Sequence, residues 1–161
     1  MTKCNGWNNG HRDYVLEYLD PNAQQSQVVP RCTQTHWSLP FEQNYKGNFD
    51  VAFFDDSGCA VIGVVFRDHM GQIIATLSQR IPLVQSVELA EAMAARHALL
   101  FAKELSLFNV EIEGDCSRVI TALNQLGRSY TLFGHITNEC NRLGATLRFC
   151  KFRHVRREGI G

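Results

Sequence analysis

The chain has 161 residues, of which 45% are hydrophobic and 10% aromatic, enough for one packed domain with room for a tail. Lys plus Arg and Asp plus Glu number 16 each, so net charge alone does not indicate a nucleic-acid partner. No apolar run approaches the about eighteen residues of a membrane span, and the polar start MTKCNGWNNGHRD lacks a signal-peptide core. We therefore expect an intracellular monomer, in the nucleus or the cytoplasm, without membrane contact.

Residues 1–45 are rich in Asn, Gln, Ser, Thr and Pro, which predicts a poorly ordered polar tail or linker. One short amphipathic piece within it, DYVLEYLD (13–20), is typical of one or two helical turns. Because the chain has neither a CxxC pair nor an export signal, we expect its cysteines to be reduced thiols. A zinc site is an alternative interpretation of four residues whose spacings fit none of the compact finger patterns: Cys4, His11, Cys32 and His36.

Dense hydrophobic periodicity predicts one domain over residues 46–161. The segment NFDVAFF (48–54) and two β-rich runs around the turn DHMG (68–71) predict three antiparallel strands. The later pattern alternates between strands and helices, with helices at 86–105, 117–126 and 134–145 and strands at 109–113 and 146–155. This order predicts a mixed five-stranded α/β sheet with helices on its faces, whose later strands run parallel through right-handed crossovers.

Glu91 lies in the middle of the face that the predicted helix 86–105 buries. Spacing residues about 100° apart places it among small and apolar side chains, namely Val87, Ala94, Ala95, Ala98, Ala102 and Leu105. His97 falls on the polar side of the same helix, so we expect it at the surface. Because burying an ionised acid without compensation costs several kcal/mol, the Glu91 carboxylate needs a partner.

Two further acids are candidates for that site. Asp50 lies on the first strand, on the face opposite Phe49 and Val51, and Asp115 lies where the strand 109–113 turns into a helix. If these two strands are parallel neighbours, we expect the three carboxylates to meet on one face of the sheet. Their mutual repulsion is usually relieved by a hard divalent cation with oxygen ligands, Mg²⁺ or Mn²⁺, which suits phosphoryl chemistry.

Each acid also has a structural interpretation. Asp115 is a natural helix N-cap, and capping need not exclude metal ligation. Glu91 could pair with an arginine from another element, and Asp50 could be a surface charge on an edge strand. Glu111 and Glu113 alternate with hydrophobic neighbours, which predicts a solvent-exposed strand face.

Positive charge gathers near the C-terminal end of the sequence. Between residues 142 and 158 there is one acid, Glu158, against the basic residues Arg142, Arg148, Lys151, Arg153, Arg156 and Arg157. Such a local excess is typical of contact with nucleic-acid phosphates. We predict that four of these residues make the contacts, namely Lys151, Arg153, Arg156 and Arg157.

Taken in order, these motifs resemble the plant reverse-transcriptase-like branch of the type 1 ribonuclease H superfamily, over residues 37–160. The family's W-x-P-P and K-x-N-x-D-G-A look like WSLP and KGNFDVA in this chain. Its E-x-x-A-x-x-x-A-L matches Glu91 to Leu99, its E-G-D-S looks like EGDC, and its H-V-x-R-E-x-N resembles HVRREGI. The ordered set is specific, although any one motif alone is weak.

The resemblance implies a ribonuclease H-like fold and a defined set of site residues. It carries the catalytic, metal-binding acids onto Asp50, Glu91 and Asp115. It also matches His154 to the family's loop histidine, which assists departure of the product. The alternative interpretation of His154 is a surface histidine at the end of a strand. The implied activity is Mg²⁺- or Mn²⁺-dependent hydrolysis of RNA in an RNA–DNA hybrid, whose minor-groove 2′-hydroxyls mark the RNA strand.

The chain departs from the family pattern at several positions. Val51 replaces a glycine, Cys116 a serine and Ile160 an asparagine, and the sequence stops at Gly161, before the helix that carries the family's fourth acid. We therefore expect a C-terminally truncated or diverged domain, from a retroelement or from a host gene derived from one. An alternative function is a nucleic-acid-binding module with an impaired metal site, and a third is a scaffold without nucleic-acid contact.

Overall fold

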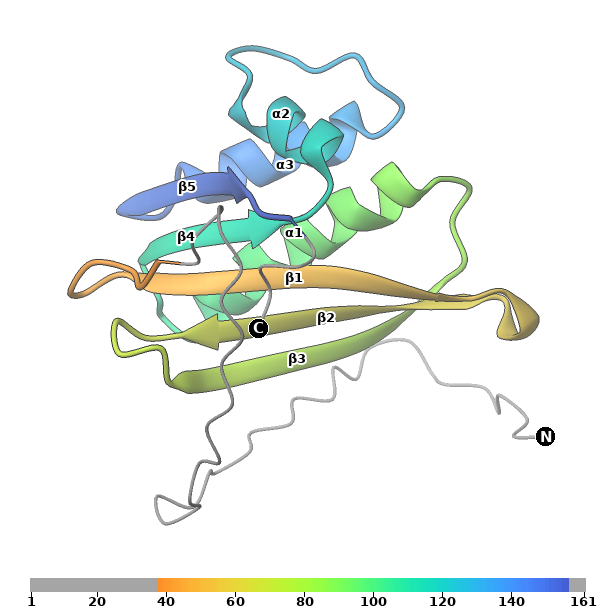
Figure 1. Ribbon diagram of the computed structural model, residues 1–161. Coiled ribbons are helices and arrows are strands. Elements are labelled where there is room, and N and C mark those ends of the chain that lie inside the picture. Colours follow the sequence, from red (N-terminus) through yellow and green to blue (C-terminus); the bar gives the residue numbers. More distant parts are fainter. Residues whose placement is uncertain (1–37, 157–161) are drawn as a thin grey trace.

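The computed structural model describes residues 38–156 (Figure 1). The predicted helix 13–20, the four candidate zinc ligands and Arg157 lie outside the described residues. The predicted tail therefore stays a prediction. The first strand begins at Tyr45, one residue before the predicted start of the domain.

Five strands form one mixed sheet in the order β3-β2-β1-β4-β5. Three antiparallel neighbours come first in the chain: β1 (Tyr45–Phe54), β2 (Cys59–Arg67) and β3 (Ile73–Pro82). β4 (Asn109–Gly114) then runs parallel to β1, and β5 (Phe149–His154) runs parallel to β4. The predicted sheet of three antiparallel strands followed by parallel crossovers is confirmed.

Two tight connections join the three antiparallel strands. After β1 the short 3-10 helix η1 (Asp55–Ser57) leads into Gly58, whose φ of 58° lies in the left-handed region that glycine adopts without a Cβ clash. Between β2 and β3, the Asp68 carboxylate accepts the backbone N–H groups of Met70 and Gln72, each at 2.9 Å. Two backbone hydrogen bonds close the same turn, from the Asp68 N–H to the Gln72 carbonyl and from the Gly71 N–H to the Asp68 carbonyl, each at 3.0 Å.

Three helices lie together on one side of the sheet (Figure 1): α1 (Val87–Glu104), α2 (Ser117–Asn124) and α3 (Gly134–Gly144). The Ser86 hydroxyl caps α1 by accepting the Leu89 N–H at 3.1 Å. α1 packs against β1, β2 and β4, and also against α2 and α3. Over residues 38–156, none of the helices combines the length and the apolar character needed to span a membrane.

Two predictions about the faces of α1 were wrong. His97 is buried rather than exposed, and its Nδ1 lies 2.7 Å from the carbonyl oxygen of Met93. Val87, placed on the buried stripe, is 55% exposed at the start of the helix. Because α1 contacts α3 as well as the sheet, its buried arc is wider than the single stripe that periodicity indicates.

Phenylalanine rings pack closely against the sheet in the core between the sheet and the helices. The rings of Phe66 on β2 and Phe101 on α1 have centroids 5.9 Å apart. On the same side of the sheet the Phe49 ring covers Gly114, where an added Cβ would lie 2.3 Å from the Cζ atom of Phe49. A glycine is therefore required at the end of β4.

We expect Gly114→Ala to lower the free energy of unfolding by about 1–3 kcal/mol, because the methyl group overpacks the Phe49 ring. Urea denaturation followed by circular dichroism measures this loss. The matched control is Gly63→Ala on β2, where an added Cβ meets nothing within 4 Å. A change beyond about 0.5 kcal/mol in the control would show that backbone effects, not overpacking, dominate.

Four cysteines lie in the described part of the chain, and all are free thiols: Cys59, Cys116, Cys140 and Cys150. Burial raises the pKa of Cys140 to about 12 and that of Cys150 to about 11. Both thiols are therefore protonated at neutral pH, and only the thiolate reacts with disulfide reagents.

At pH 8 we expect the folded protein to leave Cys140 and Cys150 unmodified by a thiol-reactive disulfide reagent. Unfolding in urea returns both thiols to ordinary pKa values, so that they react within minutes. Peptide mass spectrometry with and without urea measures the difference. Labelling of Cys140 in the folded protein as fast as in urea would contradict its burial.

Candidate metal centre

Three acids from separate elements meet at one place in the structure. Asp50 comes from β1, Glu91 from α1 and Asp115 from the residue after β4, and each offers a carboxylate oxygen within 4.8 Å of the other two. Glu91 is 2% exposed, Asp115 is half-buried and Asp50 is exposed. Oxygens on opposite sides of one Mg²⁺ lie about 4.2 Å apart, so small side-chain rotations suffice for shared coordination. The donor set therefore fits a hard divalent cation.

The end of the parallel ladder explains where the acids meet. Pairing between β1 and β4 stops at Asn48 and Glu113, two residues before Asp50 and Asp115. Phe49 is buried under the helices, so Asp50 alternates to the opposite side of the sheet, whereas Glu91 projects from the helical side. The acids consequently converge where β4 ends. They do not share one face of the sheet, and that part of the sequence prediction was wrong.

The valine that follows Asp50 also has a defined place. Val51 belongs to the buried core, so its branched side chain points away from the exposed side of β1. Its backbone N–H donates to Oδ1 of Asp50 at 2.8 Å. This hydrogen bond orients the carboxylate and needs no glycine.

The position of Asp115 differs from the predicted N-cap of the following helix. The N-cap residue of α2 is Cys116, and it makes no side-chain cap hydrogen bond. Asp115 therefore lies one residue outside the N-cap position. Nε2 of the exposed His154 donates to the carbonyl oxygen of Asp115 at 3.0 Å, which places the histidine beside the acids. Its role in product departure stays a prediction.

Glu111 and Glu113 were predicted to be solvent-exposed, and both are buried. Nζ of the fully buried Lys46 lies 2.9 Å from Oε1 of Glu113 and 3.9 Å from Oε2 of Glu111, and it also donates to the Ser38 carbonyl. Parallel pairing puts Lys46 directly opposite Glu111. The counter-charge comes from a strand more than sixty residues away, which the local pattern of β4 does not reveal.

A ladder of polar pairs thus leads to the three acids along the side of the sheet opposite the helices. Its two rungs follow the parallel register and pair a cation with an anion and then an amide with an anion: Lys46 with Glu111, and Asn48 with Glu113. Two residues beyond the second rung, Asp50 and Asp115 bring two negative charges close together. Together with Glu91 they offer the oxygen ligands that a hard divalent cation takes in proteins.

The basic residues on and after β5 differ in their availability. Lys151 and Arg156 are exposed. Arg153 is half-buried, and its Nη1 lies 3.5 Å from Oε2 of Glu111, so part of its charge is neutralised within the protein. Of the four predicted phosphate contacts, these three fall within residues 38–156.

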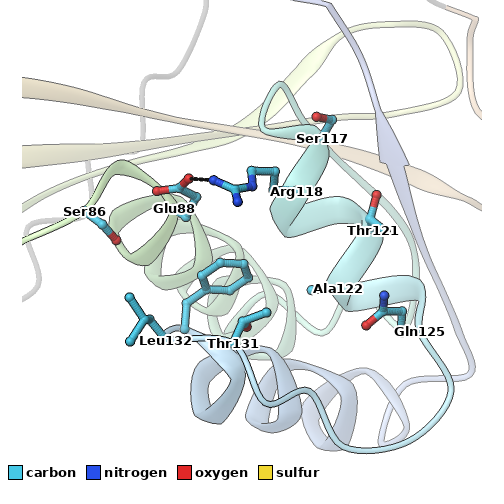
Figure 2. A pocket seen from close by; sticks show the side chains of 10 residues that line it. Ser86, Glu88, Ser117, Arg118, Thr121, Ala122, Gln125, Thr131 and Leu132 are labelled. Carbon is cyan, nitrogen blue, oxygen red and sulfur yellow. Dashed lines mark hydrogen bonds and ion pairs between the residues drawn. The ribbon is translucent and has the colours of Figure 1, made fainter.

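A hollow of about 550 Å³ opens beside the acids between α1, α2 and the loop before α3 (Figure 2). Its edge is one helical turn from Glu91, at Glu88, and two residues from Asp115, at Ser117. Nη1 of Arg118 binds Oε1 of Glu88 at 2.7 Å across the hollow. A backbone N–H, and after it Arg118, hold the pKa of Glu88 below its ordinary value. The acids themselves do not line this space.

Solved structures of ribonucleases H share this fold. Ribonuclease H1 of the archaeon Halobacterium salinarum is 22% identical, with a TM-score of 0.64 over 71% of this chain and 87% of its own. The N-terminal ribonuclease H domain of a Mycobacterium tuberculosis protein is 16% identical, with a TM-score of 0.60 over 71% and 84%. LC11-RNase H1, isolated from compost, is 20% identical in its complex with an RNA/DNA hybrid, with a TM-score of 0.58 over 71% and 86%.

Sequence comparison gives the family directly. No curated protein matches the chain. Residues 48–160, well over half of the 161, match the family described as reverse transcriptase-like. This match shows that the chain belongs to the reverse transcriptase-like family, and its fold is the one seen in solved ribonucleases H.

Proposed function

We propose that the protein hydrolyses the RNA strand of an RNA–DNA hybrid in a reaction that depends on a divalent metal ion. The observation that carries the proposal is the convergence of Asp50, Glu91 and Asp115, whose carboxylate oxygens lie within 4.8 Å of one another just beyond the last paired residues of β1 and β4. Family membership supports it, as does the fold shared with LC11-RNase H1, which was solved with an RNA/DNA hybrid.

The three carboxylates would hold Mg²⁺ or Mn²⁺. A bound ion of this kind lowers the pKa of a coordinated water and stabilises charge on a scissile phosphate. Glu91 supplies a rigid donor because it is buried on α1, and the exposed Asp50 faces incoming substrate. The Val51 N–H holds the Asp50 carboxylate in one orientation, which reduces the reorganisation needed on binding.

Exposed cations near the acids would bind the phosphate backbone. Lys151 lies on β5, and Arg156 follows that strand just beyond His154, which contacts Asp115. Arg118 and several hydroxyl groups line the hollow of Figure 2 and offer further donors. Phosphate contacts give affinity without sequence preference, which suits an enzyme that recognises hybrid geometry.

We expect Lys151→Ala and Arg156→Ala each to reduce the slope of log K against log salt concentration by about 0.9, the value for one lost phosphate contact. Arg153→Ala should reduce it by less, because Arg153 also neutralises Glu111. Fluorescence anisotropy of a labelled hybrid between low and moderate salt measures the slopes. Binding that ignores ionic strength would contradict phosphate contact and favour a scaffold.

The test of the proposal is a cleavage assay on a hybrid with a label on either strand. We expect RNA-strand cleavage with Mg²⁺ or Mn²⁺, none in excess EDTA, and none of the DNA strand. A DNA duplex and single-stranded RNA serve as substrate controls. Hybrid binding without cleavage under either metal would contradict the enzyme and favour a nucleic-acid-binding module.

A further inference from the structure

The second rung in the ladder of polar pairs, Asn48 with Glu113, lies two residues before Asp50 and Asp115. Glu113 is 1% exposed, and both of its carboxylate oxygens are bound from β1. Oε1 lies 2.9 Å from Nζ of Lys46, and Oε2 accepts from Nδ2 of Asn48 at 2.9 Å. Glu113 is therefore fastened to the neighbouring strand at two points.

The same group of contacts extends to a third strand. Nη1 of Arg67 on β2 donates to Oδ1 of Asn48 at 3.2 Å, so the Asn48 amide bridges Arg67 and Glu113. The resulting chain of contacts crosses β2, β1 and β4 through side chains alone. Hydrogen bonds within a buried network are stronger than in water, and a fully bonded network makes its surroundings rigid.

We call the contacts among Lys46, Asn48 and Glu113 the clamp. The clamp lies next to the three acids of the candidate metal centre. Asn48 and Glu113 form the last backbone pair between β1 and β4, and Asp50 and Asp115 each follow two residues later. Beyond that pair the β1–β4 ladder contributes no further rungs to hold the two strands together. The spacing between Asp50 and Asp115 is consequently set by the last rung, where the Asn48–Glu113 hydrogen bond lies.

We infer that Asn48 and Glu113 are positioning residues for the metal centre, acting through the spacing of β1 and β4. The inference rests on the proposed function, since it assigns a role toward the ion that Asp50, Glu91 and Asp115 would bind. Neither residue is a metal ligand, because the contacts of Glu113 are already made to Lys46 and Asn48. A site for a small hard cation needs its donors held within about 0.5 Å, which is the precision that a clamped rung supplies.

The test measures Mn²⁺ binding by the whole chain without substrate, from the loss of the free-ion signal in electron paramagnetic resonance. We expect Asn48→Ala to weaken Mn²⁺ binding by about tenfold, the lower bound for losing an outer contact of a metal site. Asn48→Thr is a second variant that retains strand propensity and is too short to bridge to Glu113. In the cleavage assay, high Mn²⁺ should restore the rate of both variants, with the KM for hybrid unchanged.

The matched control is Asn124→Ala. The Asn124 amide also joins two elements, donating to the carbonyls of Ile120 on α2 and Phe152 on β5, each at 3.1 Å. It should shift the urea midpoint as Asn48→Ala does but leave Mn²⁺ affinity unchanged. Equal Mn²⁺ affinity in wild type and both Asn48 variants would overturn the inference, as would equal weakening in Asn124→Ala. Absence of Mn²⁺ binding by the wild type would contradict the proposed function itself.

Discussion

Replacing Lys46 by Met is expected to lower the free energy of unfolding by about 3–5 kcal/mol, the usual cost of removing one partner of a buried ion pair. Lys46 is fully buried with its ammonium 2.9 Å from Glu113 and 3.9 Å from Glu111. The variant leaves the Glu113 carboxylate with Asn48 alone, and buried charge without compensation is costly. Urea unfolding followed by circular dichroism, with an unchanged denaturant slope, measures the loss.

Two further variants separate lost charge from lost packing. In the double variant Lys46→Met with Glu113→Gln, the neutral amide removes the uncompensated charge, and we expect part of the stability to return. Lys103→Met changes an exposed lysine near the end of α1 and should stay within about 0.5 kcal/mol of wild type. A loss in Lys46→Met as small as that in Lys103→Met would show that the buried pair contributes little.

Asp50→Asn and Glu91→Gln are each expected to reduce hybrid cleavage more than about 100-fold, since even outer contacts of metal sites are worth 10–100-fold. Both substitutions keep the shape of the side chain and remove one negative oxygen donor. In EDTA they should stabilise the fold slightly, by about 1 kcal/mol or less for the exposed Asp50, because one repulsion among clustered acids is gone. Lost activity with retained or increased stability distinguishes a site residue from a folding residue.

The control for this pair is Asp56→Asn, an exposed aspartate in the turn after β1 that lies outside the cluster. It should cleave hybrid at the wild-type rate. Undiminished cleavage by Asp50→Asn would remove this carboxylate from the chemistry. If Asp56→Asn lost activity equally, the assay would be reporting a general effect of charge.

The order and type of the elements were predictable because each has a strong local signal. The period of α1 and the alternation along β1 both appear in neighbouring residues. The family motifs then carried the site onto Asp50, Glu91 and Asp115, which the structure brings together. Helix α2 ends at Asn124, two residues before its predicted end, because Gln125 is already extended.

The errors at Glu111, Glu113 and His97 share one physical origin, which is contact between distant segments. Glu113 alternates with hydrophobic neighbours as a solvent-exposed residue would. Only the parallel register of β4 with β1 places Lys46 beside it. His97 lies on the polar side of α1 when the helix is considered alone, but α1 has neighbours on more than one side. Periodicity describes one element at a time, so partners across the sheet or between helices do not appear in it.

The hydrogen bond from Asn48 to Glu113 joins residues that are 65 positions apart in the chain. The hairpins β1–β2–β3 can form from adjacent residues, whereas the β1–β4 rung must close a loop that contains two strands and α1. Pairings this distant in sequence form slowly, because the chain entropy of the loop is lost before the contact stabilises it. We therefore expect Asp50 and Asp115 to be brought together late in folding, so that a cation bound between them would stabilise the native protein over every partly folded form.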